Sequence, residues 1–220
     1  MAVSKAWEWN KETSSIWLQP SEESYYIAQR WKDKGFKRVL DFGCGLGRHS
    51  ILFAKHGFHV SAFDLSEEAT VHLKSWAEKE ELPVDITNAD MLKLPYEDNS
   101  FDAIFAYHVI SHTDSVGIKR IINEISRVLR ISGEVFLTLC SKESWSFRDA
   151  GYPKLDENTV IKTEEGPEKG VPHFYVDLDD ILDLFSNYDI ERIRYIDDCY
   201  FDGKKQNCKH YFLTASLRAK

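Results

Sequence analysis

The sequence predicts an α/β domain whose parallel sheet carries helices on both faces. Short apolar runs alternate with longer amphipathic segments from about residue 38 to about residue 139. Strands separated by helices at this rhythm form parallel sheets. The chain also has 220 residues, 43% of them hydrophobic, which is enough for one domain with a full core.

The first five expected strands are short apolar or aromatic runs, each bounded by glycine, proline or polar residues. They cover residues 38–42, 59–63, 84–87, 101–107 and 134–139. The first run ends in a cluster of glycines, and the last follows Gly133. Because the intervening segments have helical spacing, we expect these strands to lie side by side in one sheet.

Three helices are expected between these strands. The first passes through residues 50–54 and ends at Gly57, a common position for a helix terminator. The second begins after Ser66, a favourable N-cap, and extends to Glu81. The third has apolar residues at helical spacing, namely Ile118, Ile121, Ile122, Ile125, Val128 and Leu129.

The last third of the chain has a different pattern. Residues 141–175 contain several glycines and prolines without periodicity, so we expect an irregular insertion there. A short helix near Asp177 is followed by strands over 190–196 and 210–217, with a turn around 202–203. The predicted organisation is as follows: an aromatic-rich leader or cap at 1–36, a core at 37–140, an insertion that shapes the substrate pocket at 141–176, and the final helix and two strands of the same domain at 177–220.

The charge balance and the cysteines restrict the binding partners and the cellular compartment that we expect for this chain. With a net charge of −8, a duplex nucleic acid is not the expected partner, because binding phosphates requires a clustered basic face. No apolar stretch is long enough to span a membrane. The cysteines have no pairing pattern and no metal-like spacing with histidines, so we expect reduced thiols, no metal site and a cytoplasmic location. These cysteines are Cys44, Cys140, Cys199 and Cys208.

The most informative segment is the glycine loop that follows the first strand and opens a helix. It runs from Asp41 to Gly47 with the spacing G-x-G-x-G, and glycines let a ligand approach the main chain closely. The dinucleotide-binding fingerprint needs G-x-G-x-x-G, but its third glycine would fall at Arg48. The loop therefore does not favour a pyrophosphate site. We expect Arg48 and His49 on the helix surface.

From about residue 38 to 140, the chain resembles the class I S-adenosylmethionine-dependent methyltransferases. Their first motif is an acid followed by G-x-G-x-G, and the matching cofactor-binding residues here are Asp41, Gly43, Cys44, Gly45 and Gly47. The resemblance implies a Rossmann-like three-layer α/β/α sandwich, in which a seven-stranded, mostly parallel sheet has an antiparallel last strand. It also implies S-adenosyl-L-methionine as cofactor and S-adenosyl-L-homocysteine as product.

Further matches lie at the ends of the next strands. Asp64 matches the acid that binds both ribose hydroxyls in the family, since a carboxylate offers two acceptors to a diol. Asp90 matches the acid that accepts from the adenine amino group, and Leu65 and Met91 would supply apolar walls for the ring. Tyr107, which ends the fourth strand, completes the expected cofactor contacts.

The methyl acceptor is expected beyond the fourth strand, because ligands bind at the carboxyl ends of parallel strands. His112 resembles a histidine found there in small-molecule members of the family and is the candidate base; a structural histidine that caps the next loop is the alternative. His108 and His173 are further pocket candidates. The leader contributes Trp17 and Tyr25 as possible pocket walls, although packing against the sheet edge would also explain its aromatic residues.

These features predict methyl transfer to the oxygen, nitrogen or sulfur of a small-molecule acceptor by in-line displacement. Two alternatives stay open: a non-catalytic protein that binds S-adenosylmethionine, and a nicotinamide-dependent oxidoreductase. The Asn/Asp-Pro-Pro-aromatic motif typical of enzymes that methylate nucleobases or amides is missing after the fourth strand. The acceptor, the need for a general base, the oligomeric state and the pathway cannot be inferred from the sequence.

Overall fold

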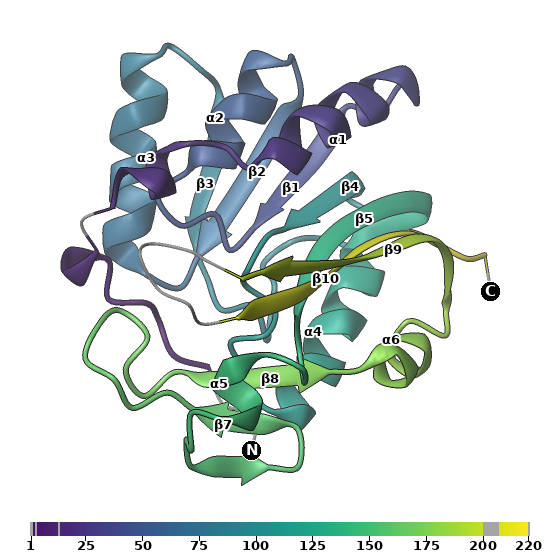
Figure 1. Ribbon diagram of the computed structural model, residues 1–220. Helices are drawn as coiled ribbons and strands as arrows, with labels where there is room; N and C mark the ends of the chain where they lie inside the picture. Colours follow the sequence, from purple (N-terminus) through teal and green to yellow (C-terminus); the bar gives the residue numbers. More distant parts are fainter. Residues whose placement is uncertain (1, 3, 13, 200–206, 220) are drawn as a thin grey trace.

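The computed structural model describes residues 2, 4–12, 14–199 and 207–219. In it a central sheet lies between two layers of helices (Figure 1). The helices are η1 (Trp9–Lys11), η2 (Ser15–Leu18), α1 (Glu22–Asp33), α2 (Arg48–Lys55), α3 (Glu67–Lys79), α4 (Ser115–Val128), α5 (Trp145–Arg148) and α6 (Leu178–Leu184). The strands are β1 (Arg38–Phe42), β2 (His59–Asp64), β3 (Val84–Asn88), β4 (Phe101–Ala106), β5 (Leu129–Ser141), β6 (Lys154–Asp156), β7 (Thr159–Ile161), β8 (Pro172–Val176), β9 (Tyr188–Asp198) and β10 (Cys208–Leu217).

Seven of these strands form the central sheet in the order β3, β2, β1, β4, β5, β10, β9. The first five are parallel to one another; Leu40, for example, pairs with Ser61 on one side and Ile104 on the other. β10 is antiparallel to both of its neighbours, with Leu213 opposite Leu137 on β5. The predicted mostly parallel sheet with an antiparallel last strand is therefore confirmed, but the predicted count of seven strands is too low, because β8, β7 and β6 extend the sheet to ten strands.

The prediction of an irregular insertion over 141–175 is wrong. This segment contains α5 and three strands, and β8 extends the sheet by pairing in parallel with the end of β5 at Cys140 and Ser141. β7 pairs with β8 and β6 with β7, both antiparallel. β6 and β7 have three residues each, which is too short for any periodicity to appear in the sequence.

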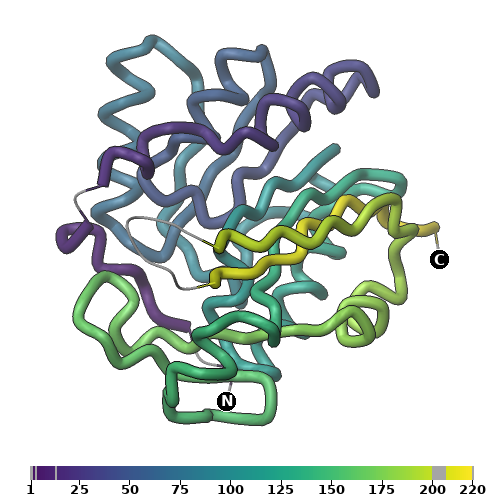
Figure 2. The backbone as a smooth tube through the Cα atoms, viewed as in Figure 1, coloured from purple at the N-terminus to yellow at the C-terminus, as the bar shows by residue number. Residues whose placement is uncertain are grey.

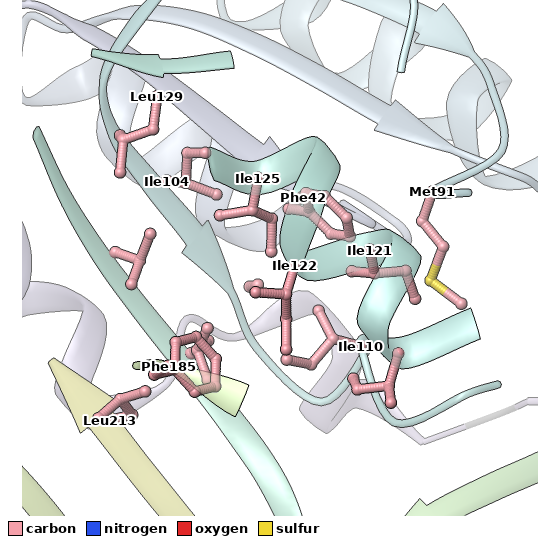
Figure 3. Packing of buried hydrophobic residues seen from close by; sticks show 14 of the residues in the cluster. Phe42, Met91, Ile104, Ile110, Ile121, Ile122, Ile125, Leu129, Phe185 and Leu213 are labelled. Atoms are coloured by element: carbon pink, nitrogen blue, oxygen red, sulfur yellow. The ribbon is translucent and has the colours of Figure 1, made fainter. Parts of the chain in front are cut away.

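The helices cover both faces of the sheet. Successive side chains along each strand point alternately to one face and to the other. On β4, Phe105 packs in a cluster with residues of α1 and α2, whereas Ile104 packs in the larger cluster that includes α4 and α6. Figure 3 shows Ile121, Ile122 and Ile125 of α4 among the side chains of that larger cluster. The spacing of these isoleucines thus predicted the buried stripe of α4 correctly.

Several boundaries differ from the predictions. β5 begins at Leu129, five residues before the expected start, and passes through Ser132 at φ 62° with a register shift against β4. α3 ends at Lys79, before Glu81, whose φ of 55° is left-handed. β4 ends at Ala106. The predicted turn at 202–203 lies outside the described residues.

The leader crosses the molecule before it reaches α1. In Figure 2 it runs beside the loop of the insertion, and the backbone N–H of Glu8 donates to the carbonyl of Pro167 at 3.3 Å. The Asn10 N–H donates to Glu68 at the start of α3. The leader therefore connects the insertion with the first helical layer. Across the described residues, no helix combines the length and the apolar character needed to cross a membrane.

Candidate functional site

A cavity of about 1100 Å³ opens at the carboxyl ends of β1, β2 and β4. The glycine loop and the ends of β2 and β4 line it on the side of the sheet, and the leader and residues 162–168 supply further walls. Ligands bind at this end of the strands in open parallel sheets. Since a pocket for one small ligand has roughly 300–1000 Å³, the cavity has room for one extended ligand, or for two ligands near the lower end of that range.

The glycine loop between β1 and α2 presents its backbone to this cavity. Gly43, Cys44 and Gly45 line it, and the loop is held against β2 because the Cys44 N–H donates to the carbonyl of Phe63 at 2.8 Å. Gly45 has φ +52°, and a Cβ on it would lie 2.7 Å from Cζ2 of Trp9. A side chain here would strain the backbone and enter the cavity.

Gly47 and Asp41 support the loop from behind and do not line the cavity, so their predicted direct contact with a cofactor is corrected. Gly47 is the N-cap of α2 with φ 99°, and Leu73 occupies the space that a Cβ would need. Asp41 is 2% exposed and accepts a hydrogen bond from Ser50 Oγ at 2.5 Å. Burial raises its pKa to about 7. Gly47 thus begins α2, and Asp41 near the end of β1 holds this helix through Ser50.

Asp64 brings a carboxylate from the end of β2 to the cavity wall. Its Oδ2 accepts from the Gly45 N–H and its Oδ1 from the Ser66 N–H, each at 2.9 Å. Each oxygen retains a lone pair for a ligand. Burial raises the pKa of this carboxyl, and the two backbone donors limit the shift. Leu65 and Met91 also line the cavity, so the structure brings these predicted residues together.

Asp90 and Tyr25, which were predicted to contact the adenine amino group and to form a pocket wall, are not among the residues that line the cavity. The Asp90 carboxylate is turned toward the leader and its own loop, because it accepts from Ser4 Oγ and from the Leu92 N–H, each at 2.8 Å. Tyr25 is 51% exposed on α1, since that helix buries the face that carries Trp31.

Three tryptophans of the leader meet over the glycine loop. The ring centroids of Trp7, Trp9 and Trp17 lie 4.8–5.7 Å apart, with edge-to-face geometry. All three line the cavity, as predicted for Trp17. The indole N–H groups of Trp7 and Trp9 are buried and have no hydrogen-bond partner among the described residues. These two donors are available to a ligand that carries acceptors.

Arg48 and His49, expected on the surface of the helix, instead hold the leader in place. The Arg48 guanidinium donates to the carbonyls of Ile16 and Gln19 at 2.9 and 3.1 Å. His49 is buried and accepts from the Ser21 N–H at 3.1 Å. Burial lowers the pKa of His49 well below its usual value, which leaves the ring neutral and able to accept. Both residues also line the cavity, and no motif in the sequence marked them.

Tyr107 and His108 line the cavity where β4 ends, as predicted. The Arg48 guanidinium lies 5.6 Å from the centre of the Tyr107 ring, and burial raises the pKa of Tyr107, so its hydroxyl stays protonated. The His108 backbone has φ 54°, and its N–H donates to Thr138 Oγ1 at 2.7 Å. Burial, together with the nearby His210 ring, lowers the pKa of His108 well below its usual value.

His112 and His173 lie together at another part of the cavity wall, with ring centroids 4.7 Å apart. Burial lowers the pKa of His112 to about 3 and also lowers the pKa of His173. Both rings are therefore neutral near pH 7, and His112 is a weak base. Lys162 and Glu168 complete this corner. Sequence reasoning missed them because they lie in a segment without periodicity.

Comparison with known proteins agrees with this geometry. Residues 39–133 match the family model described as methyltransferase domain. The chain is 33% identical over 118 residues to a sterol 24-C-methyltransferase of Gibberella zeae, a match that covers 51% of this chain and 30% of that protein. It is 31% identical over 117 residues to a ubiquinone biosynthesis O-methyltransferase of Coxiella burnetii, covering 53% of this chain and 49% of that protein. The chain thus spans 30% of the length of the first of these curated relatives and 49% of the second.

Among solved structures, an S-adenosylmethionine-dependent methyltransferase from Methanosarcina mazei superposes with a TM-score of 0.71 at 20% identity. The match covers 83% of this chain and 93% of that one. At this identity the likeness shows the fold. Together with the match of residues 39–133 to the methyltransferase domain model, it shows a Rossmann-like methyltransferase fold and supports the resemblance to the class I S-adenosylmethionine-dependent methyltransferases.

Proposed function

We propose that this chain is an enzyme that transfers a methyl group from S-adenosylmethionine to a small-molecule acceptor. One observation carries the proposal: the glycine-loop backbone and the Asp64 carboxylate line one side of a cavity that has room for a second ligand. The family match and the named activities of the relatives support it.

The residues on the side of the sheet suit the nucleoside part of the cofactor. Asp64 offers lone pairs to a ribose diol while its backbone donors hold the carboxylate in place. The Gly43 and Gly45 backbone has no Cβ that would keep a ligand away. Leu65 and Met91 offer apolar contact to a flat base. We propose these five residues as the cofactor contacts.

The cofactor supplies a methyl group bound to a positively charged sulfur, and a nucleophile takes this group by in-line displacement. The chain contributes alignment and the exclusion of water. Trp7, Trp9 and Trp17 close the cavity over the glycine loop, and aromatic faces attract a desolvated cation. We place the acceptor beside His112, whose ring centroid lies 6.4 Å from that of Trp7.

Methyl transfer from labelled S-adenosylmethionine into a fractionated cell extract tests the proposal. The small-molecule fraction should gain label with the unsubstituted chain, and Asp64→Asn should lose most of this transfer. Asp85→Asn is the matched control, because Asp85 is an exposed acid on the neighbouring strand β3. Label in protein or RNA alone would contradict the acceptor class. Binding of cofactor without any transfer would favour the non-catalytic alternative.

A further inference from the structure

Three side chains with metal-binding atoms converge on the wall of the cavity from separate segments. His112 follows β4, Glu168 belongs to the loop before β8, and His173 lies on β8. The Nε2 atom of His173 lies 3.2 Å from Glu168 Oε1, and the Nε2 atom of His112 lies 3.8 Å from the same oxygen. One ligand atom from each residue lies within 4.8 Å of the other two, a spacing that one bound ion could bridge with small movements.

A neutral His173 ring cannot satisfy both of its contacts, because each partner is an oxygen that only accepts. Its Nδ1 lies 3.1 Å from the carbonyl oxygen of Val171, and its Nε2 faces Glu168 Oε1. A neutral imidazole donates through one nitrogen and accepts through the other. When Nδ1–H donates to the carbonyl, the lone pair of Nε2 points at the carboxylate. A cation between the two groups removes this repulsion, and a carbonyl on Nδ1 is the usual outer partner of a metal-binding histidine.

Lys162 fixes the charge and the orientation of the carboxylate. Its Nζ pairs with Oε2 of Glu168, which leaves Oε1 facing the two imidazoles. The pair keeps the carboxylate ionised, the form that binds metals. With a divalent ion bound, the charges of the ion, Lys162 and Glu168 sum to about +2. Such a corner favours an anionic ligand in the remaining coordination positions.

We propose that His112, Glu168 and His173 bind a divalent first-row transition-metal ion at the acceptor end of the cavity. Two histidines and one carboxylate form the donor set of catalytic zinc sites and of non-haem iron sites with open positions. The inference rests on the proposed function and extends it: the ion would bind the acceptor oxygen or sulfur as its anion, with the proton released to solvent. The bond between the methyl group and the cofactor's sulfur then breaks as the bond to the acceptor atom forms, and the neutral thioether leaves. The acceptor is therefore a molecule with an ionisable hydroxyl or thiol.

The leader supports the same class of acceptor. The ring of Trp7 is nearly parallel to that of His112, with an interplanar angle of 16° and centroids 6.4 Å apart, so Trp7 borders the same corner of the cavity. The indole N–H groups of Trp7 and Trp9 are buried without a partner in the described part of the chain. An anionic acceptor offers lone pairs to such donors. The prediction of no metal site was based on cysteine spacing, and these three ligands have no recognisable spacing in the sequence.

Metal titration of the full chain, freed of any histidine tag and treated with a chelator, tests the proposal. Co²⁺ and Zn²⁺ should each bind at one equivalent by calorimetry, and bound Co²⁺ should give visible absorption bands. Glu168→Gln and His112→Gln should each weaken binding by about ten-fold or more. Circular dichroism and thermal melting of each variant establish that it is folded. His59→Gln removes an exposed histidine on β2 and should leave binding unchanged.

Binding that survives both ligand substitutions, or that falls equally in His59→Gln, would overturn the metal site. No saturable binding to the unsubstituted chain would do the same. Because the titration contains no S-adenosylmethionine, its result does not depend on methyl transfer. Methyl transfer that persists unchanged in excess chelator would leave the proposed function intact and overturn the role of the ion.

Discussion

A buried carboxylate on β5 holds the first helix against the sheet, and Glu134→Gln should weaken the fold measurably. The Glu134 side chain is 0% exposed. It accepts from Arg30 Nε at 2.9 Å, from Trp31 Nε1 at 2.7 Å and from Lys34 Nζ at 2.5 Å. All three donors lie at the end of α1, the helix that follows the leader. This carboxylate therefore also anchors the element that carries the leader to the cavity.

The expected loss is about 3 kcal/mol in the free energy of unfolding. Breaking a buried ion pair by removing one partner costs roughly 3–5 kcal/mol. The lower end applies because glutamine keeps one acceptor oxygen for Trp31. The side chains of Arg30 and Lys34 are also 18% and 35% exposed, so both can turn to water. At roughly 2–4 °C per kcal/mol for a domain of this size, Tm should fall by about 6–12 °C.

Urea unfolding at pH 7, followed by circular dichroism, measures this loss. Glu191→Gln is the matched control, because Glu191 pairs with the same Arg30 but its side chain is 48% exposed. An exposed pair contributes about 0–1 kcal/mol, so the control should stay close to the unsubstituted chain. Equal losses in the two variants, or a loss below about 1 kcal/mol for Glu134→Gln, would refute the reasoning.

The difference in stability between the unsubstituted chain and Glu134→Gln should also depend on pH. Burial alone would raise the pKa of Glu134, but hydrogen bonds from Arg30, Lys34 and Trp31 outweigh it and lower the pKa below its usual 4.5. A carboxyl with a lowered pKa stabilises the fold above the unfolded value, and this stability is lost as the pH falls through the folded pKa. The free energy of unfolding of the unsubstituted chain should exceed that of Glu134→Gln by a constant amount near pH 7, and this difference should shrink below about pH 4.5.

Three further substitutions test the construction of the site. Gly45→Ala should weaken binding of S-adenosylhomocysteine by about ten-fold or more, because the added Cβ enters the cavity near Trp9; unchanged affinity in calorimetry would contradict this. Arg48→Met should raise the acrylamide quenching of tryptophan emission, because the guanidinium lies 5.0 Å from the Trp17 ring; equal quenching would argue against its anchoring role. Asp41→Asn should stabilise the fold more at pH 8 than at pH 5: burial raises the pKa of Asp41 to about 7, and the fold loses stability as the pH rises from the unfolded-state pKa of about 4 to this value. If urea titration shows that Asp41→Asn raises the free energy of unfolding equally at both pH values, the raised pKa of Asp41 would be contradicted.

The sequence predicted the central sheet well because its strands are buried runs with helices between them. β1 was placed at its observed bounds and β2 within one residue, since each ends at a glycine cluster or an acid. The strands inside the predicted insertion were missed for a physical reason. β7 has three residues and pairs with β8 across an intervening loop, so tertiary pairing rather than local pattern creates both strands.

The candidate site was predicted in part, for similar reasons. Asp64 and Gly45 lie where the motif placed them, because loop geometry after a parallel strand is local. Arg48 faces the cavity because the leader packs over it, and no local pattern reveals that contact. The orientation of Asp90 depends on Ser4, far away in the chain. Glu168 meets His112 only in the folded molecule.

Calorimetric titration with S-adenosylhomocysteine tests the central claim, that the cavity holds this nucleotide through Asp64. The account predicts micromolar binding, about −8 kcal/mol, and no comparable heat with NAD. Asp64→Asn should weaken the affinity by about ten-fold or more, whereas Asp85→Asn should leave it unchanged. Tight binding that Asp64→Asn does not alter, or binding of NAD in place of the sulfur nucleotide, would contradict the account.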